Sequence, residues 1–302
     1  GETIVSRGEL VEIGGDFRVP DVMAGSGTRM VEVGTTNRTH LEDYRRAIND
    51  DTRLIMRVHP SNYRIVGFVS SPALAELTTL AHEAGLPLYE DAGSGQLSDL
   101  SAYGIVDEPV VREIIETGVD VVSFSGDKLL GSAQAGLIVG RHAIVARLRK
   151  HPLYRALRSD KLRLAALEAT LVSHQKDLAH EEVPVIQMLA LSKDEVEQRA
   201  RGLIEAVGPS EATFELLDGE STIGGGAGPT SNSPTMLIAV SHPTMSAQEI
   251  EHRLRASEPA VIGRISEGKV LLDLRTVFPD EMTFIGDRLK EIFPGKGAKA
   301  QS

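Results

Sequence analysis

Cysteine is absent from this 302-residue chain. Its absence excludes disulfide bonds, thiolate nucleophiles and cysteine-ligated metal sites, and it fits a reducing compartment. No window approaches the uninterrupted apolar length of a membrane helix, and the N-terminus shows no signal-peptide pattern. We therefore expect a cytoplasmic protein with no membrane association.

Two common catalytic motifs are also missing. No pair of histidines has the H-E-x-x-H spacing of a helical zinc site, which argues against a metal hydrolase. The segment "GDKLLGS" contains glycine and lysine but lacks the Walker order, in which GK[ST] ends the loop and opens the helix. The lysine of that segment, Lys128, therefore needs another explanation.

Positive charge is scarce overall and concentrated in one segment. The chain has 43 acidic and 32 basic residues, with a formal net charge of −11, which argues against a nucleic-acid binder that uses its whole surface. Residues 141–163 nevertheless hold eight Lys/Arg and one Asp. Such a segment is either a solvated helix face or an anion-binding site, and charge alone does not choose between them.

The first half of the chain alternates short apolar segments with amphipathic ones. Residues 71–85 have the pattern of a helix capped by Ser71, and residues 107–118 that of a helix capped by Asp107, each ending at a glycine. This alternation predicts βαβ units and a mostly parallel sheet. The expected strands are Thr3–Ser6, Arg29–Val33, Leu54–His59, Pro87–Asp91, Val119–Ser125 and Gly136–Val139.

The second half predicts a smaller α+β domain. Helical patterns dominate from residue 141, and a helix is expected over 185–207 and another from Ser246. The low-complexity stretch "GGGAGPTSNSP" separates two strands, 214–217 and 235–240, and a strand pair follows at 261–265 and 270–274. The expected organisation is a large domain over 1–170, a small domain over 171–292 and a disordered tail over 293–302.

Asp91 and Lys128 form the most informative pair of residues. Asp91 ends a predicted strand, and Lys128 follows the next predicted strand 37 residues later, so both side chains can face one cleft at the carboxyl edge of the sheet. This arrangement fits pyridoxal 5′-phosphate chemistry, in which a carboxylate keeps the pyridine nitrogen protonated and a lysine holds the aldehyde as a Schiff base. Ser125 suits the cofactor phosphate, and Gly93 and Gly126 permit close backbone approach.

Four motifs carry a resemblance to a known family. The segments "VSFSGDKLLGSAQAGLIVGR", "HPLYRALRSDKLRLAALEATL", "VEVGTTNRTHLEDYRRAI" and "SNYRIVGF" resemble the bacterial selenocysteine synthases, the L-seryl-tRNA(Sec) selenium transferases. The likeness covers residues 6–170 and continues more weakly through "GGGAGPTSNSP" and "VIGRISEGKVLLDLRTVFPDE". Pro60 and Ser132–Ala133 depart from the family pattern. The resemblance implies a fold-type I, aspartate aminotransferase-like α/β enzyme that uses pyridoxal phosphate.

The resemblance also assigns roles to single residues. It makes Lys128 the Schiff-base lysine and Asp127 an active-site aspartate. It makes Arg155 and Arg158 the arginines that hold the anionic selenium donor, a role that suits guanidinium groups because they bind oxyanions bidentately.

Fold-type I enzymes imply further cofactor contacts. Asn62 and Asp91 fit positions that contact the ring oxygen and the ring nitrogen, and His59 is a further candidate for a ring or substrate contact. For Asn62, a purely structural role in a turn stays open.

The implied reaction converts seryl-tRNA(Sec) to selenocysteyl-tRNA(Sec) through a dehydroalanyl intermediate, with selenophosphate as the donor. The resemblance also implies a homo-oligomer, either a dimer or a pentamer of dimers. Two other functions stay open: a related lyase acting on a free amino acid or amino sugar acid, and an inactive truncated module.

The family pattern includes an upstream phosphate loop and an N-terminal helical domain that these residues do not show. We therefore expect residues 1–302 alone to bind tRNA weakly and to hold the cofactor poorly.

Overall fold

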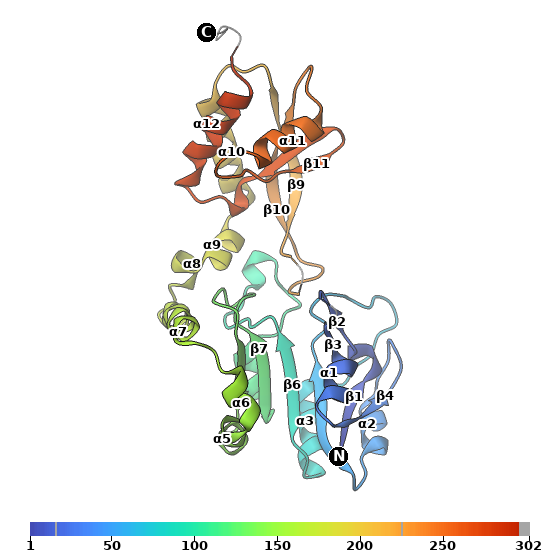
Figure 1. The fold of residues 1–302 in the computed structure, drawn as a ribbon. Coiled ribbons are helices and arrows are strands. Elements are labelled where there is room, and N and C mark those ends of the chain that lie inside the picture. Colours follow the sequence, from blue (N-terminus) through green and yellow to red (C-terminus); the bar gives the residue numbers. More distant parts are fainter. Residues whose placement is uncertain (16, 225, 296–302) are drawn as a thin grey trace. The chain divides into compact units, whose positions relative to one another are not determined.

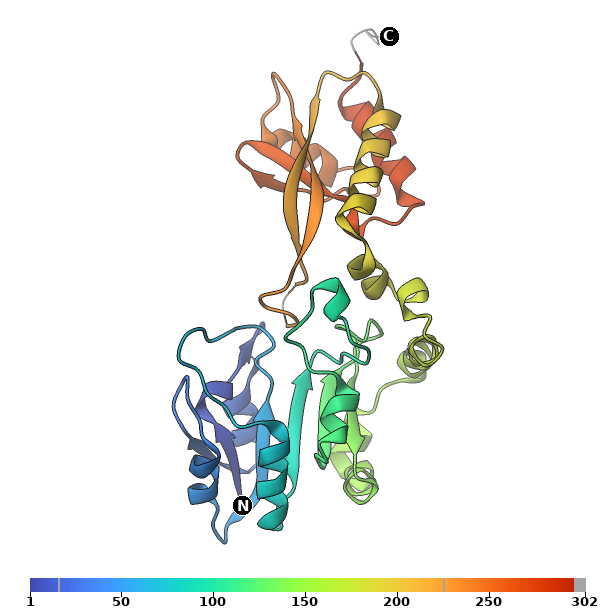
Figure 2. The ribbon, with the colours of Figure 1, turned by 180° about the vertical axis from the view of Figure 1, so that it is seen from behind.

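The chain forms two compact units in the computed structural model, which describes residues 1–15, 17–224 and 226–295 (Figures 1 and 2). The first unit contains Gly1–Gln187 together with Ile223–Ser231, and the second contains Met188–Thr222 and the chain from Asn232 onward. Each unit has its own hydrophobic core.

A six-stranded sheet forms the centre of the first unit. Its strand order is β4-β1-β5-β6-β7-β8, and all neighbours are parallel except β7 and β8. Each of the six predicted strands is confirmed with ends that differ by at most two residues. The strands are β1 (Glu2–Ser6), β4 (Arg29–Val33), β5 (Thr52–Val58), β6 (Leu88–Gly93), β7 (Val121–Ser125) and β8 (Gly136–Gly140).

Helices cover both faces of this sheet because alternate strand residues point to opposite sides. Ile55 packs in a cluster with Leu77 and Ile114, whereas its neighbour Met56 packs in a second cluster with Met23. The helices and short elements of this unit are η1 (Arg7–Glu9), α1 (Val19–Gly25), α2 (Leu41–Ala47), α3 (Leu74–Glu83), η2 (Ser101–Tyr103), α4 (Val111–Glu116), α5 (His142–Lys150), α6 (Pro152–Leu157), α7 (Lys161–Gln175), α8 (Ala179–Glu182), α9 (Pro184–Ala190, which reaches the second unit) and the hairpin β2 (Glu12–Ile13) with β3 (Phe17–Arg18).

The first unit extends further along the chain than the predicted boundary at residue 170. The reason is that α7 is tied to the loop after β7. Thr170 Oγ1 donates to Ser132 Oγ at 3.0 Å, and His174 Nε2 lies 3.1 Å from the Leu130 carbonyl oxygen. The division therefore falls within α9.

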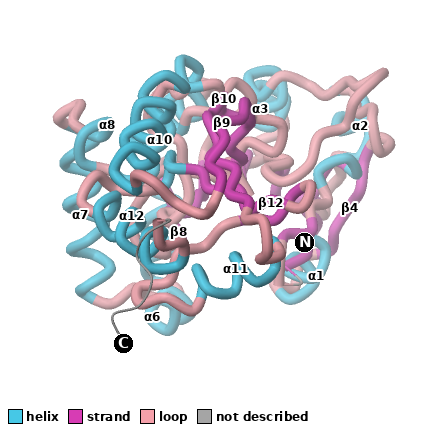
Figure 3. Tube along the Cα trace, turned by 90° about the horizontal axis from the view of Figure 1, so that it is seen from above, coloured by secondary structure: helices cyan, strands magenta, loops and turns pink. Residues whose placement is uncertain are grey.

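The second unit is a four-stranded antiparallel sheet with helices packed on one face. Its strand order is β11-β12-β10-β9, and β9 and β10 run side by side over ten residue pairs (Figure 3). Its elements are α10 (Lys193–Val207), β9 (Thr213–Thr222), β10 (Asn232–Ser241), α11 (Ala247–Arg255), β11 (Arg264–Ser266), β12 (Lys269–Asp273), η3 (Leu274–Thr276) and α12 (Glu281–Ile292). The predicted small α+β architecture is present.

A buried arginine holds this second unit together. The guanidinium of Arg275 donates to the carbonyl oxygens of Met188, Leu191 and Pro234 at 2.6–3.0 Å, and to Ser221 Oγ at 3.1 Å. These bonds join the start of the unit to its sheet, and they satisfy the polar atoms of a residue that is only 4% exposed.

Two predicted helix starts are wrong. The helix expected after Ser71 begins at Leu74, where the Glu76 carboxylate accepts the Ala73 N–H at 3.0 Å. The helix expected after Asp107 is α4, which begins at Val111. No side chain of the described residues caps α4, and the Val111 N–H instead donates to the Gln96 carbonyl oxygen at 2.9 Å.

The single helix expected over 185–207 is two helices, α9 and α10. Ser192 interrupts it because its hydroxyl accepts the Glu195 N–H at 3.2 Å and so starts α10. The predicted cap of α11 by Ser246 is confirmed.

The predicted tail begins too early. Phe293 is 1% exposed and belongs to the core of the second unit, where its ring meets Phe214 edge to face. Residues 296–302 of the predicted tail lie outside the described residues. Among the described helices, none is both long enough and apolar enough to cross a membrane.

Candidate active site

Asp91 lies at the carboxyl end of β6, in the middle of the sheet, as predicted. It is opposite Ser123 of β7, whose hydroxyl donates to Asp91 Oδ1 at 3.2 Å, and the Gly93 N–H donates to the same oxygen at 3.3 Å. Tyr89 OH lies 2.7 Å from Ser123 Oγ and so completes a short polar chain. Burial raises the pKa of Asp91, although these two hydrogen bonds oppose the rise.

Lys128 lies in the loop that joins β7 to β8, and β7 is the strand next to β6 in the sheet. Its side chain is partly buried, and its positive charge acts to lower the pKa of Asp91. Within the described part of the chain, Asp91 forms no ion pair within 4.0 Å. The strand order therefore brings the lysine and the carboxylate to one place and leaves the carboxylate without a direct countercharge.

A loop from the second half of the chain lies against Lys128. Residues 223–231 belong to the first unit, and a Cβ added to Gly226 would lie 3.0 Å from Lys128 Nζ and 3.1 Å from its Cε. Gly226 also has a φ of +94°, which side-chain-bearing residues rarely adopt. The backbone conformation thus favours glycine here, and an added Cβ would make the end of the Lys128 side chain shift slightly.

Glu108 anchors this loop. Its side chain is fully buried, and Oε1 accepts the Gly228 N–H at 2.6 Å. Oε2 lies 3.5 Å from His59 Nε2, and neither of these two atoms has a hydrogen-bond partner within the described residues. Burial alone would raise the pKa of Glu108, but its contacts with His59 and Gly228 outweigh burial and lower it.

The predicted glycine positions permit close packing. A Cβ on Gly126 would lie 2.7 Å from the Ala133 carbonyl oxygen, and Gly93 has a φ of +68° with Ser61 3.3 Å from an added Cβ. Ser125 is the last residue of β7, and its side chain forms no hydrogen bond with any described residue. Its hydroxyl therefore stays available for a ligand.

Four other predicted residues do not join this group through any contact of the described chain. Asn62 is exposed, and its amide donates to the Glu12 carbonyl oxygen at 2.7 Å instead of pointing to Asp91. Asp127 is exposed beside Lys128. Arg155 and Arg158 are exposed at α6, and no hydrogen bond or ion pair links them to Asp91 or Lys128.

The sequence analysis missed Glu108 and the role of residues 223–231. The helical pattern over 107–118 predicts that Glu108 lies inside a helix, whereas it lies in the loop before α4. The run of glycines was the available signal for 223–231, because glycines at high density mark places where a backbone approaches another group closely.

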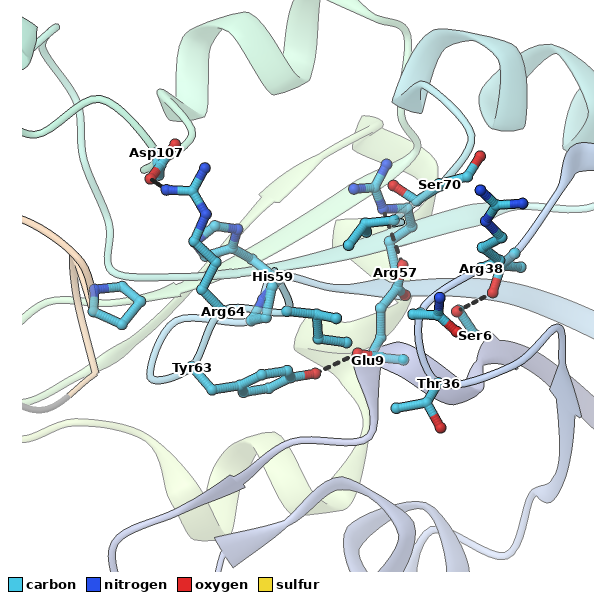
Figure 4. A pocket seen from close by; sticks show the side chains of 18 of the residues that line it. Ser6, Glu9, Thr36, Arg38, Arg57, His59, Tyr63, Arg64, Ser70 and Asp107 are labelled. Atoms are coloured by element: carbon cyan, nitrogen blue, oxygen red, sulfur yellow. Dashed lines mark hydrogen bonds and ion pairs between the residues drawn. The ribbon is translucent and has the colours of Figure 1, made fainter. Parts of the chain in front are cut away.

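A cavity of about 260 Å³ adjoins this group. Its lining includes His59, Arg38 and Glu9, and Pro229 and Thr230 of the loop also line it (Figure 4). His59 lines this cavity and also contacts Asp91. Its backbone N–H donates to the Asp91 carbonyl oxygen at 2.9 Å.

Comparison with known proteins identifies the family. The family model described as L-seryl-tRNA selenium transferase (SelA) matches residues 1–278. The L-seryl-tRNA(Sec) selenium transferase of Geobacter sulfurreducens is 50% identical over 295 residues, which are 96% of this chain and 64% of the relative. That of Carboxydothermus hydrogenoformans is 46% identical over 287 residues, 94% of this chain and 61% of the relative. The chain thus spans less than two thirds of the length of these relatives.

A solved structure supports the fold. D-glucosaminate-6-phosphate ammonia-lyase superposes with a TM-score of 0.62 at 22% identity, covering 96% of this chain and 70% of that one. The predicted fold-type I α/β architecture is confirmed. The resemblance first carried by four motifs extends over nearly the whole sequence, and this chain belongs to the L-seryl-tRNA selenium transferase (SelA) family.

Proposed function

We propose that this chain carries the catalytic residues of an L-seryl-tRNA(Sec) selenium transferase that acts in the cytoplasm with pyridoxal phosphate. In the overall reaction, selenium from selenophosphate replaces the hydroxyl of the seryl group, and phosphate is released. The observation that carries the proposal is the family match over residues 1–278. Within it, Asp91 lies at the end of β6 and Lys128 lies in the loop that follows the neighbouring strand, β7. Identity of 46–50% to named transferases favours this function over that of the 22% identical lyase.

The residues around Asp91 fit pyridoxal phosphate. Asp91 is a partly buried carboxylate with two hydrogen-bond donors and no ion pair in the described chain, so a cationic ring nitrogen would supply the missing countercharge. When bound, the cofactor supplies an electron sink for charge that develops at the substrate α-carbon. Lys128 and Asp91 would hold the cofactor, and Ser125 would donate a hydrogen bond to its phosphate.

Each residue then has a defined task. Lys128 Nζ removes the proton from the α-carbon of the seryl group and returns one there at the end of the reaction. Asp91, whose carboxylate is held by hydrogen bonds from Ser123 and Gly93, would keep the proton on the ring nitrogen of the bound cofactor. Glu108 holds Gly228, and Gly226, two residues earlier, lies against Lys128, so this contact limits the access of water to the lysine amine.

Arg155 and Arg158 bind the selenium donor in this proposal. Both are exposed and carry no carboxylate partner among the described residues, so their guanidinium groups are free for an oxyanion. Asp127, next to Lys128, is the remaining active-site candidate from the family resemblance.

Self-association belongs to the same proposal. Leucines on the helices after β8 are unusually exposed for large apolar side chains: Leu153 is 60%, Leu157 79% and Leu162 77% exposed. Apolar surface of this kind is stabilised when another chain covers it. We propose a homo-oligomer of at least two chains.

Selenium transfer tests the proposed function. The chain, joined to the part of the G. sulfurreducens relative that it does not span, is incubated with pyridoxal phosphate, labelled selenophosphate and seryl-tRNA(Sec). Label should appear in the aminoacyl group of the tRNA, and the Lys128→Ala variant should give none. Turnover of free amino acids without transfer to tRNA would contradict the proposal.

A further inference from the structure

The cavity beside His59 has the chemical character of a nucleotide site. It lies where β1 and β5 end, and it is lined by residues that follow these strands and by the segment 36–39 (Figure 4). Hydroxyl groups of Thr36, Ser70 and Ser71 and apolar side chains line the same space. All its lining residues belong to the first unit.

A cation without a carboxylate partner stands at the rim. Arg38 is exposed and forms no ion pair with any described residue. Its Nε donates to the Phe68 carbonyl oxygen at 3.3 Å, and its guanidinium lies 5.9 Å from the centre of the Phe68 ring. By contrast, Arg64 is neutralised by Asp107, with Nη1 2.5 Å from the carboxylate. Arg38 is therefore the rim group free to bind a phosphate.

The interior of the cavity is acidic and does not suit a bare oxyanion. Glu9 is 7% exposed. Its Oε2 accepts the Val58 N–H at 3.1 Å, and its Oε1 lies 3.6 Å from Arg57 Nε. Arg57 is shared with a second buried carboxylate, Glu90, 3.8 Å away, and Arg57 Nε has no hydrogen-bond partner within the described residues. Of these two carboxylates Glu9 lines the cavity; its negative charge disfavours an anion there, and its oxygens can accept hydrogen bonds from hydroxyl or amino groups.

Apolar residues complete the walls. Ile65, Val69 and Pro229 line the cavity, and apolar walls with a few polar groups are typical of sites for flat organic ligands. A ligand with a phosphate at one end, and with hydroxyl and amino donors on a ring system, matches the rim, the interior and the walls together. Neither free phosphate nor a purely apolar ligand matches all three.

We propose that this cavity binds the 3′-terminal nucleotide of the aminoacylated tRNA, with its phosphate at Arg38 and its sugar and base towards Glu9. This inference rests on the proposed function, because the seryl group is esterified to that nucleotide. His59 lines the cavity and touches Asp91 through its backbone, so a seryl group at Asp91 and Lys128 has its attached nucleoside next to this space. Pro229 and Thr230 connect the cavity to the loop that covers Lys128.

The test measures binding of adenosine 5′-monophosphate to the chain by isothermal titration, without added cofactor. Ribose 5-phosphate and inorganic phosphate are titrated in parallel. We expect saturable binding of the nucleotide, at least about tenfold tighter than that of phosphate. At pH 8, where the Glu9 carboxylate is ionised although burial raises its pKa to about 7, Arg38→Ala and Glu9→Gln should each weaken nucleotide binding about tenfold, the size of one lost charge-assisted contact. Arg112→Ala removes an exposed arginine outside the cavity and should leave binding unchanged.

Each outcome of the titration either supports or overturns the assignment of the cavity to a nucleotide. Absence of saturable nucleotide binding overturns the assignment, whatever the transfer assay gives. Equal affinity for phosphate, or equal loss in the Arg112→Ala variant, also overturns it, because the site would then be a general anion surface. Circular dichroism of each variant confirms that it is folded, and Arg38→Ala keeps the test valid if Glu9→Gln fails to fold. A chain that binds the nucleotide as expected but transfers no selenium would count against the proposed function alone.

Discussion

Replacing Glu9 by glutamine should change how the stability of the first unit depends on pH. Burial raises the pKa of Glu9 from 4.5 to about 7, and the Arg57 charge only partly opposes this rise. Since the folded-state pKa lies above the unfolded value, the folded protein binds this proton more tightly. The stabilisation from the bound proton is complete below about pH 4.5 and is lost as the pH rises to about 7.

The magnitude follows from the size of the rise. A change from 4.5 to about 7 corresponds to about 3 kcal/mol of unfolding free energy, at about 1.4 kcal/mol per pH unit. Glutamine resembles the protonated acid and can still accept the Val58 N–H. The variant should therefore not lose this stabilisation as the pH rises. Between pH 4.5 and pH 8, its free energy of unfolding should increase by about 3 kcal/mol relative to that of the unmodified chain.

Tyrosine fluorescence during urea unfolding measures this difference. The chain has five tyrosines and no tryptophan, and all five tyrosines lie before residue 160, so the signal reports the first unit. Glu116→Gln is the matched control, since Glu116 is exposed and has no ion pair among the described residues. If Glu9→Gln and the unmodified chain keep the same stability difference at both pH values, the reasoning about Glu9 is wrong.

Four further predictions concern the candidate site and the assembly. Borohydride reduction in the presence of pyridoxal phosphate should label Lys128 in a peptide map, and label confined to other lysines would disprove its role. Gly226→Ala should slow this labelling at least about fivefold, because the new methyl group displaces the lysine amine. Gly224→Ala is its control, since Gly224 also has positive φ but nothing within 4 Å of an added Cβ, and equal effects would refute the contact. Replacing Arg155 and Arg158 together by alanine should raise the selenophosphate concentration needed for half-maximal transfer at least about tenfold and leave cofactor affinity unchanged; unaltered donor dependence would exclude them. Sedimentation equilibrium at micromolar concentration should show at least a dimer, and a stable monomer would contradict the proposed self-association.

Strands were predictable from the sequence because their apolar runs are local. Residues such as Ile4, Ile55 and Val122 are fully buried in the central sheet, and a continuous apolar segment between turn residues indicates such a strand without knowledge of its neighbours. The order of the strands then brought Asp91 and Lys128 together, since the carboxyl ends of parallel strands meet at one edge.

Helix starts were less predictable because a capping side chain can find a better partner elsewhere. Asp107 has the residue type and spacing of a cap, but its carboxylate accepts hydrogen bonds from Arg64 and Thr230 instead. Thr230 lies 123 residues away in the chain. The local sequence around Asp107 contains no information about a hydrogen-bond donor that lies so far away in the chain.

The sequence by itself determined the family and the strands of the sheet, and it predicted the Asp91–Lys128 pair, because each is expressed in local motifs or in the order of elements. Only the tertiary structure decided that Glu108 binds Gly228 and that Gly226 lies against Lys128. It also decided that Arg57 is shared by two carboxylates, Glu9, which lines the cavity, and Glu90. These contacts join segments far apart in the chain, and their strength depends on burial, which removes water and exists only once the whole unit has folded.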